Sequence, residues 1–346
     1  LSDEFCLVSG QKNQWGIFTR IAVTASTSKF SKTRCCLLGA KTDQLGPYSL
    51  YLVNSRQSLY LGGTALITGP ISIAAAGLRA DLTGKGYSRE SLYDGKPEIS
   101  GDELPFHFSA LVRSNLNWIK GKFSNTDSVV SIEEATNTSI GQSFNKPTLR
   151  IQSADSIVLR EGELKGNILV YSPEGIYVSG NMKLEDVILV SPKISIAAGF
   201  SGNCQILSSN TIYLAKGATL LYPSSILHIN EYDSNEGGTA VTLDSLSRFN
   251  GSILMLNMPN LSRSSLLSVL SGAEVNGFVY CETRMDLAGK VNGALYIRQF
   301  VQSSSSSYRE NYLTDGQVAP MKNWKLFAVP KTDNPGAEIS IVKWTK

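Results

Sequence analysis

The sequence is short of charged residues and of side chains that bind metals or exchange protons near neutral pH. Asp, Glu, Lys and Arg make up 18% of the 346 residues, and there are only two histidines and five cysteines. An average soluble domain has ~25% charged residues. Hydrophobic residues still reach 42%, enough for a folded core, and Ser, Asn, Thr and Gly replace the missing charges. This composition is typical of a secreted or surface β protein rather than of a cytosolic enzyme.

Long apolar runs and basic stretches are also missing. A membrane-spanning helix needs ~20 apolar residues. The longest runs here, "ISIAAAG" from Ile71 and "ISIAAGF" from Ile194, have only the length of a strand. The net charge is +3, and Lys and Arg are scattered singly along the chain. We therefore expect neither a transmembrane segment nor a nucleic-acid partner.

The chain opens on Leu1, without an initiator Met or a signal peptide, which we interpret as a mature or truncated chain. Together with the composition, this predicts an extracellular location or one at the cell surface or in the cell envelope. An anchor upstream of residue 1 is compatible with that prediction.

The five cysteines do not form a metal-binding pattern. They lack the C-x-x-C spacing of a zinc site, and the two histidines, His107 and His228, are far from them in sequence. We therefore expect no metal and no cofactor. Three cysteines lie in the first 36 residues, so Cys6 could form a disulfide with Cys35 or Cys36 in an oxidising compartment. The alternative is that all five are small buried side chains.

The clearest pattern in the chain is an 18-residue repeat. Two apolar residues, one position apart, return at this interval in "EGIYVSG", "KISIAAG" and "NTIYLAKG". These residues are Ile176, Val178, Ile194, Ile196, Ile212 and Leu214. Each repeat holds two short segments in which apolar and polar residues alternate, as in β-strands. One turn of a parallel β-helix explains the interval, because coils stacked at ~4.8 Å place these residues in inward columns.

A second recurring unit places Asn-Gly before an apolar pair, in "FNGSIL", "VNGFVY" and "VNGALY". Asn and Gly tolerate the left-handed backbone that the corners of a coil need. Alternation extends from residue 48 to 302 with few helical segments, which disfavours an α/β fold. The sequence therefore predicts an all-β fold, a right-handed parallel β-helix or solenoid. An antiparallel β-sandwich is the alternative.

Both ends of the chain and one internal stretch depart from the repeat. We predict an N-terminal cap or irregular β segment over 1–47, the β-helix over 48–302, and a tail or cap over 303–346. An insertion is expected at 101–150, with a short helix after Pro105. Irregular capping segments at both ends of the rod would block edge-to-edge growth, so we expect a monomer or a weak dimer.

Two stretches resemble known families of β-helix proteins. The run "GAEVNGFVYCETRMDLAGKVNGALYIRQF" is similar to the glycine-punctuated coils of bactofilin-like, polymer-forming β-helices. The stretch "LYLGGTALITGPISIAAAGLRADLTGKGY" resembles anchored surface solenoids of Bacteroidetes. The resemblance covers roughly residues 48–302. It implies the β-helix fold and an envelope protein, and it supplies no catalytic residue.

A β-helix enzyme that acts on polysaccharides would need carboxylates clustered on one side of the coil. The candidates are Asp155, Glu161 and Glu163 with Arg160, followed by Glu174, Glu185 and Asp186. The 18-residue interval aligns Glu174 with Pro192 and Asn210, and no carboxylate column results. We interpret these charges as solvated turn residues and both histidines as structural. The sequence therefore predicts no catalytic residue and no metal ligand.

Tyrosines on the outer surface could bind sugars. Tyr171, Tyr177 and Tyr213 lie in or beside repeat strands, and Tyr177 and Tyr213 share a phase, with Ser195 between them. They would form an outward, interrupted aromatic column. The high β propensity of tyrosine also explains their presence.

These patterns predict a non-enzymatic structural or adhesive protein of the cell envelope or surface. Its expected partner is a surface glycan or another envelope protein. The alternative is a carbohydrate-active enzyme, a polysaccharide lyase or hydrolase, or a carbohydrate-binding module on the same fold.

Overall fold

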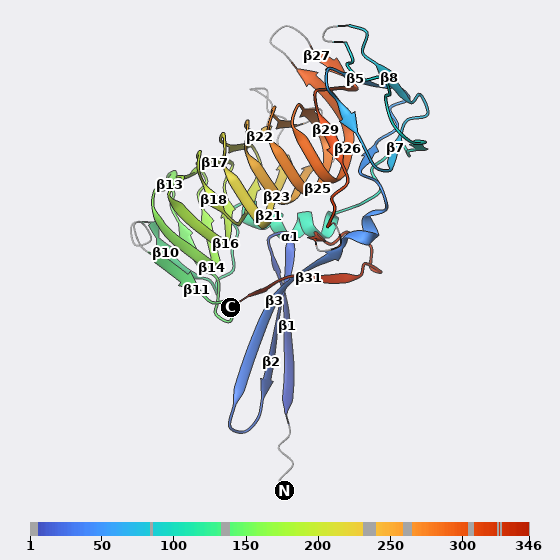
Figure 1. Ribbon diagram of the computed structural model, residues 1–346. Coiled ribbons are helices and arrows are strands. Elements are labelled where there is room, and N and C mark those ends of the chain that lie inside the picture. The colour runs from blue at the N-terminus through green and yellow to red at the C-terminus, as the bar shows by residue number, and fades with distance from the viewer. Residues whose placement is uncertain are drawn as a thin grey trace.

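In the computed structural model, most of the chain winds into a parallel β-helix, and an antiparallel sheet is attached to its side (Figure 1). The structure describes residues 6–83, 86–132, 139–230, 240–258, 265–303, 308–323, 325 and 327–345. Strands of successive coils pair in parallel and fall into three columns, which we call faces A, B and C. The predicted all-β parallel β-helix is therefore confirmed, and the antiparallel sandwich is excluded.

Face B is the longest column and combines strands from both halves of the chain. In spatial order its strands are β10 (Ser128–Ser131), β12 (Leu149–Gln152), β14 (Gly162–Tyr171), β16 (Met182–Val190), β19 (Cys204–Ser208), β21 (Thr219–Asn230), β23 (Arg248–Asn257), β25 (Glu274–Leu287), β26 (Lys290–Ser303), β4 (Leu50–Leu52), β7 (Ile71–Ile73) and β9 (Glu98–Ile99).

Faces A and C are made of shorter strands. Face C contains β13 (Ile157–Leu159), β15 (Ile176–Val178), β17 (Lys193–Ile196), β20 (Thr211–Leu214), β22 (Ala240–Leu243), β24 (Leu266–Val269), the last parts of β25 and β26, β28 (Tyr312–Thr314), β5 (Leu59–Gly62) and β8 (Leu78–Ala80). Face A contains β11 (Ser139–Gln142), β18 (Ser201–Gly202), β29 (Gln317–Ala319), β6 (Leu66–Ile67) and the first parts of the long strands β14, β16, β21, β23, β25 and β26. A short strand, β27 (Tyr308–Glu310), pairs antiparallel with the end of β26.

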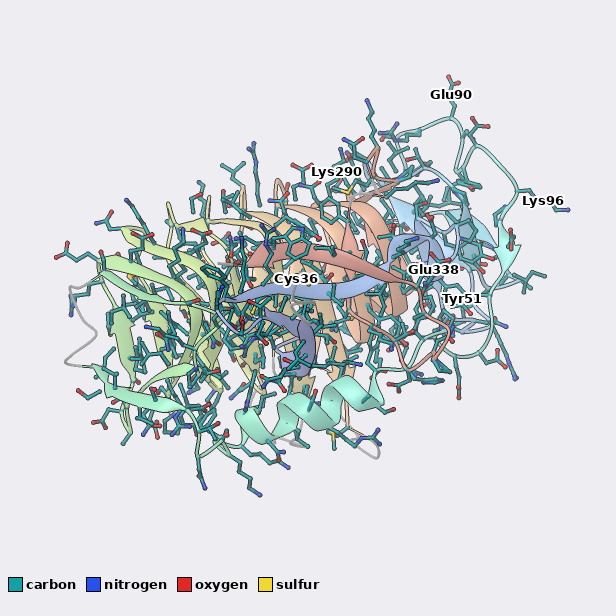
Figure 2. All side chains as sticks on the ribbon, turned by 90° about the horizontal axis from the view of Figure 1, so that it is seen from below. Cys36, Tyr51, Glu90, Lys96, Lys290 and Glu338 are labelled. Carbon is teal, nitrogen blue, oxygen red and sulfur yellow. The ribbon has the colours of Figure 1, made fainter. Side chains whose placement is uncertain are left out.

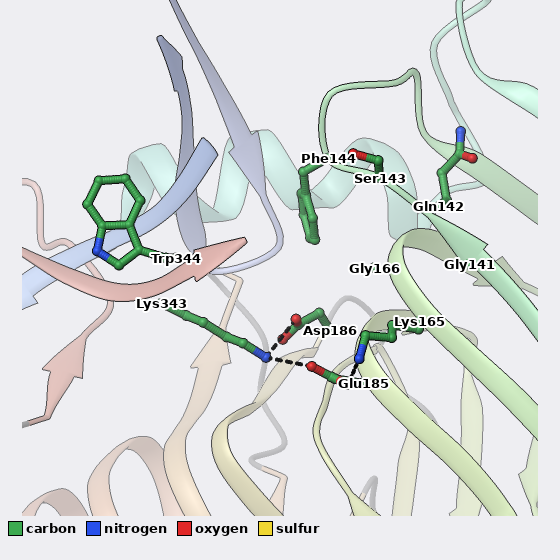
Figure 3. A pocket seen from close by; sticks show the side chains of 10 residues that line it. All are labelled: Gly141, Gln142, Ser143, Phe144, Lys165, Gly166, Glu185, Asp186, Lys343 and Trp344. Atoms are coloured by element: carbon green, nitrogen blue, oxygen red, sulfur yellow. Dashed lines mark hydrogen bonds and ion pairs between the residues drawn. The ribbon is translucent and has the colours of Figure 1, made fainter. Parts of the chain in front are cut away.

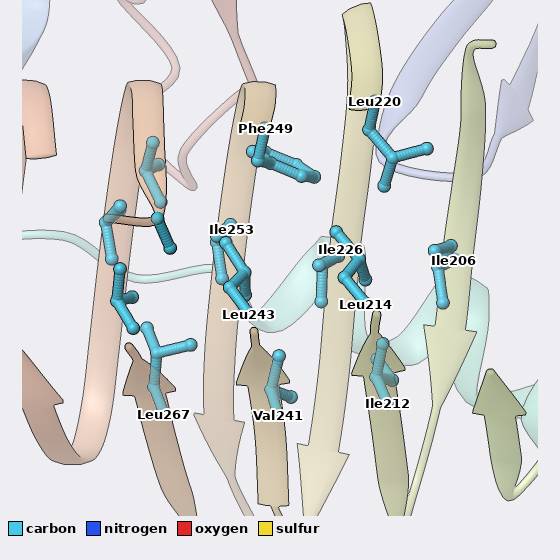
Figure 4. Packing of buried hydrophobic residues seen from close by; sticks show 14 of the residues in the cluster. Ile206, Ile212, Leu214, Leu220, Ile226, Val241, Leu243, Phe249, Ile253 and Leu267 are labelled. Carbon is cyan, nitrogen blue, oxygen red and sulfur yellow. The ribbon is translucent and has the colours of Figure 1, made fainter. Parts of the chain in front are cut away.

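The interior is filled by columns of aliphatic side chains. Ile194 pairs with Ile176 on one neighbouring coil and with Ile212 on the other, and all three are at most 3% exposed. A second buried column runs beside it through Val178, Ile196 and Leu214. Figure 4 shows how such columns continue through the following coils. Because alternate residues point to opposite sides of a strand, the residues between these columns point outward.

Asn and Gly make the corners between faces A and B in the later coils. Gly277 pairs with Gly251 and Gly293, and all three have φ near 145–150°. A Cβ at Gly277 would lie 1.9 Å from the Gly251 carbonyl oxygen, so only glycine fits. Asn276 and Asn292 form the ladder beside them, with Asn292 Nδ2 donating to Asn276 Oδ1 at 2.8 Å. The side-chain amides thus continue the hydrogen bonding of the strands around the corner.

The order of the coils in space differs from their order in the sequence. β26 pairs with β4, with Leu295 opposite Leu50, and β28 and β29 pair with β5 and β6. Residues 50–99 therefore stack beyond the coil formed by 290–319. The chain then returns along the outside to the far end of the rod, where β10 begins (Figure 1).

The returning segment carries the only α-helix among the described residues, α1 (Ser109–Ile119). This helix follows Pro105 and lies along the outside of face B. Its Leu111 packs in one cluster with Phe108, Leu254 and Tyr280. The expected insertion at 101–150 is shorter than predicted, because residues 128–131 and 149–152 already form strands of face B.

The two chain ends form one antiparallel sheet at the side of the β-helix. Its strands are β1 (Leu7–Trp15), β2 (Phe18–Ser26), β3 (Ser31–Lys41), β30 (Ala328–Val329) and β31 (Ile339–Thr345), and a 3₁₀ turn, η1 (Thr42–Leu45), leads on from β3. Figure 2 shows β3 and β31 side by side across the β-helix. Trp15 and Phe18 pack in one cluster with side chains on the outer surface of face B: Leu169, Ile188 and Leu207.

This sheet differs from the end caps expected at 1–47 and 303–346. It covers the outer side of face B, because its apolar inner surface and that of face B bury each other. At the β8 end of the rod, the segment after β8 takes the capping role. Leu92 and Tyr93 pack on the core there, and Tyr93 Oη donates to the Gly69 carbonyl at 2.6 Å.

Candidate functional site

Two exposed tyrosines lie on the outer surface of face C. Tyr177 is 46% exposed and Tyr213 is 38% exposed, and Ser195 lies between them on the intervening coil. Tyr213 Oη donates to Asp244 Oδ2 at 2.5 Å. This hydrogen bond lowers the pKa of the Asp244 carboxyl and raises the pKa of the tyrosine. The two rings and the carboxylate form a small amphipathic surface of the kind that can contact a sugar.

Tyr171 does not belong to this surface. It ends β14 on face B, where Phe123 meets its ring edge-on at a centroid distance of 4.8 Å. Its hydroxyl lies so close to Gly121 that a Cβ there would be 2.4 Å away. The segment that follows α1 therefore half-buries Tyr171. The three tyrosines named from the sequence are not brought together.

A second aromatic pair on face C involves residues from opposite ends of the chain. Tyr60 and Tyr312 are stacked, with centroids 4.8 Å apart and planes inclined by 11°. The Arg309 guanidinium lies 3.7 Å from the centre of the Tyr312 ring and binds both carboxylate oxygens of Asp81, at 3.0 and 3.1 Å. No repeat spacing could reveal this pair, because β5 and β28 are joined only by the stacking of distant segments.

A charged cluster occupies a hollow at the corner of the early coils, where β31 crosses it (Figure 3). Lys343 of β31 reaches Asp186 Oδ2 at 2.8 Å and Glu185 Oε1 at 3.1 Å. Lys165, one coil earlier, contacts the other oxygen of Glu185. The hollow has a volume of about 300 Å³, and Phe144 and Trp344 also line it. Two of the carboxylates named from the sequence are thus brought together with two lysines.

The backbone holds Asp186 in an unusual position at this corner. Its φ is +59°, and its N–H donates to Asn203 Oδ1 at 2.7 Å. Burial raises the pKa of Asp186, and the ion pair with Lys343 opposes that effect. The hydrogen bond from Lys165 lowers the pKa of Glu185. Two carboxylates and two ammonium groups neutralise one another, so this cluster attaches β31 to the rod.

The remaining candidate carboxylates do not gather. Asp155, Glu161 and Glu174 are exposed, as is Arg160, and Glu163 is half-buried on face A. In the part of the chain that the structure describes, no three His, Cys, Asp or Glu side chains form a group that could hold a metal ion. Asp155, Arg160, Glu161 and Glu174 thus lie outside the strands at the surface, whereas Glu163 lies within β14. The interpretation of Glu185 and Asp186 as solvated turn charges is wrong, because both lie in β16 and bind Lys343.

The cysteines are not paired, and the disulfide considered for Cys6 is not formed. Cys6 is exposed, Cys35 is buried and Cys36 is half-buried, each as a free thiol. Ala22 pairs with both Cys35 and Gln11, whereas Cys6 lies five residues further along the first strand. That offset is roughly 17 Å at the rise of a strand, too long for a disulfide. Cys204 and Cys281 are buried in the core.

The two histidines lie in different environments. His107 belongs to the segment before α1, and its carbonyl accepts a hydrogen bond from the Asp333 N–H at 2.8 Å. His228 is fully buried, and its Nε2 donates to the Asn210 carbonyl at 2.9 Å. Burial lowers the pKa of His228 to about 4, so the ring is neutral at physiological pH.

No family model, curated protein or solved structure matches this chain. Among the helices of the described residues, none is both long and apolar enough to cross a bilayer.

Proposed function

We propose that this protein is a non-enzymatic structural or adhesive protein of the cell envelope or cell surface, in which the β-helix acts as a rigid spacer. The observation that carries the proposal is the uninterrupted stacking of coils from two separate parts of the chain. Each coil is hydrogen-bonded to its neighbours along face B, and a single buried cluster extends from Ile151 to Ile73. Such a solenoid is stiff along its axis.

The β8 end of the rod favours a protein that does not polymerise through that end. β8 and β9 are short strands, and Leu92 and Tyr93 cover the coil beside them. Short edge strands discourage strand addition. We therefore propose a monomer or weak dimer, although the sequence of the Asn-Gly coils resembles that of bactofilin-like, polymer-forming β-helices.

Sugar binding is the second candidate function, and the exposed rings of face C favour it. Tyr177 and Tyr213 face solvent on coils two apart, and Tyr60 stacks on Tyr312 further along the same face. A long, regular face with aromatic side chains suits an extended glycan. The lyase or hydrolase alternative has less support, because Glu185 and Asp186 are engaged by lysines.

Cell fractionation and a glycan array test the two roles separately. We expect the native protein in the envelope or extracellular fraction, and no release of sugar fragments from polysaccharides. Release of reducing ends or unsaturated sugars by the purified chain would replace the structural role with an enzymatic one. For adhesion, Tyr177→Ala with Tyr213→Ala should remove array binding, whereas Val158→Ala on the same face should not.

A further inference from the structure

The antiparallel sheet ends in a tip that projects from the molecule. Every residue of β1 from Leu7 to Gln14 is exposed, and only Trp15, at the inner end, is buried. In Figure 1, the outer halves of β1, β2 and β3 extend away from the β-helix, and the turn between β2 and β3 lies at the far end. No other element of the described residues pairs with β1 besides β2.

Three large apolar side chains face solvent at this tip. Phe30 is 77% exposed, Leu7 is 73% exposed and Val8 is 68% exposed. The turn is fixed by Thr27, whose N–H donates to the Phe30 carbonyl at 2.8 Å and whose Oγ1 accepts from the Phe30 N–H at 3.2 Å. Phe30 is thus held at the end of the sheet. Leu7 and Val8 are successive residues of β1 and point to opposite faces of the sheet, so apolar side chains are exposed on both faces of the tip. Exposed apolar surface of this kind marks a binding surface.

The charged side chains of β1, β2 and β3 are all basic. Residues 6–41 contain no Asp or Glu, and their basic residues are Lys12, Arg20, Lys29, Lys32, Arg34 and Lys41. Arg20 and Lys41 bind groups at the inner end, the Phe144 carbonyl and Glu338. Lys12, Lys32 and Arg34 have exposed side chains on the outer part, and Lys29 is exposed in the turn between β2 and β3. Asp3 and Glu4 precede this stretch and lie outside the described residues.

Polar side chains separate the apolar tip from the β-helix. Thr24 pairs with Ser9 on one side and with Thr33 on the other, and the two threonine hydroxyls are 2.8 Å apart. Moving inward from Phe30 and Leu7, Lys32 lies level with Val8, the hydroxyl groups of Thr24 and Thr33 follow, and Arg34 comes next, before the buried contact with face B. The same order is found across a lipid interface, from acyl chains through headgroup phosphates to water.

We propose that the tip of the antiparallel sheet binds the surface of an anionic lipid bilayer. Phe30, Leu7 and Val8 enter the boundary between headgroups and acyl chains, and Lys32 and Arg34 contact lipid phosphates. The rod is then held off the bilayer by the length of the sheet. The proposal extends the proposed envelope role and rests on that role only for the presence of a bilayer. The exposed apolar and basic side chains of the tip belong to this chain whatever its location.

Flotation of the full chain with vesicles tests the proposal. Vesicles of phosphatidylcholine with phosphatidylglycerol should carry the protein, and vesicles of phosphatidylcholine alone should carry much less. Added salt should weaken the binding, because it screens the basic side chains. We expect Leu7→Ser with Phe30→Ser, and separately Lys32→Gln with Arg34→Gln, to reduce binding roughly tenfold or more. All four side chains are exposed, so thermal melting should be unchanged.

Matched controls lie elsewhere on the surface. Leu82 is 92% exposed and far from the sheet, and Lys183 and Lys193 are exposed on the β-helix. Leu82→Ser and the pair Lys183→Gln with Lys193→Gln should bind vesicles like the native chain. Equal binding by tip and control variants, or no binding to anionic vesicles, would overturn the proposal. So would tip variants that lose only self-association in light scattering, since the tip would then be a protein interface. Fractionation and glycan binding remain independent of these results.

Discussion

Tyr51 stacks on Tyr296, with ring centroids 5.5 Å apart and planes inclined by 14°. The two residues are paired between β4 and β26, and both rings are buried beneath the segment that carries α1. Tyr51 Oη also accepts a hydrogen bond from the Gly101 N–H at 2.9 Å. This contact therefore joins three parts of the chain: the first coil, the last long coil and the returning segment.

Replacing Tyr51 by Ala should loosen the junction between the two sets of coils. Loss of a buried aromatic side chain typically costs about 3–5 kcal/mol of unfolding free energy. Urea unfolding measures that loss, and hydrogen exchange should show faster exchange in β4 and β7 than in β16. Tyr177→Ala, at an exposed position on face C, should cost less than about 1 kcal/mol. Similar costs for both variants would show that the stack does not hold the junction.

The local register of the β-helix could be read from the sequence because consecutive coils are continuous and equally long there. The interval of 18 residues between Ile176, Ile194 and Ile212 is the interval of the strand pairing. The stacking of β4 on β26 could not be derived in this way. These strands belong to separate parts of the chain, and the repeat interval gives no register between them. A weak signal was present in "SLYLV" and "ALYIR", whose Leu-Tyr-aliphatic triplets pair in the structure.

The candidate site was predictable only where it depends on alternation within a strand. Tyr177 and Tyr213 face outward because they alternate with buried residues. The covering of Tyr171 by Phe123 depends on a segment outside the repeat. Lys343 likewise reaches Asp186 only because β31 pairs with β3. Contacts of this kind follow from tertiary packing, which neither periodicity nor propensity encodes.

The inward column predicts that a charged substitution lowers the free energy of unfolding far more at an inward position than at the neighbouring outward one. Ile194→Asp would place a charge without a partner in the core, at a side chain that is 1% exposed, and should cost about 4 kcal/mol or more. Ser195→Asp, one residue further on the outer surface of face C, should change stability by less than about 1 kcal/mol. Thermal melting of both variants makes the comparison. Equal tolerance at the two positions would contradict the register at β17.

The glycine corner predicts that adding a single methyl group there strongly lowers the stability of the fold. In Gly277→Ala the new Cβ would meet the Gly251 carbonyl at 1.9 Å with φ at +144°. We expect a loss of more than about 2 kcal/mol, since clash and backbone strain act together. Gly141→Ala is the matched control, because a Cβ there has nothing within 4 Å. Chemical denaturation should leave that control within about 0.5 kcal/mol of the native chain.

Burial of His228 makes stability depend on pH. The pKa of this ring is lowered from 6.5 to about 4, so between these values the unfolded chain binds a proton that the folded chain does not. Stability should therefore fall as the pH is lowered from about 6.5 to about 4, by on the order of 3 kcal/mol from this group. The residues paired with it, Ser208 and Met255, carry no charge that could compensate.

Unfolding of the native chain and of His228→Gln at pH 7 and pH 4.5 isolates this contribution. Whatever its stability at pH 7, the variant should lose less on acidification than the native chain. Ile229→Val, at the next position, keeps the histidine and should lower stability equally at both pH values. A variant that loses as much stability on acidification as the native chain would assign the acid sensitivity to other groups.

Lys343 should hold the end of the antiparallel sheet against the rod. The Asp186 side chain is only 8% exposed and that of Lys343 is 29% exposed. Lys343→Met therefore leaves a largely buried carboxylate without its partner, at a cost of about 1–3 kcal/mol. Amide hydrogen exchange should become faster in β31.

Adding Asp186→Asn removes the unpaired charge and should restore part of the loss. Lys193→Met, at an exposed position of β17, should leave exchange in β31 unchanged. If the double variant is no more stable than Lys343→Met alone, packing by Trp344 and its neighbours, rather than the ion pair, attaches the strand.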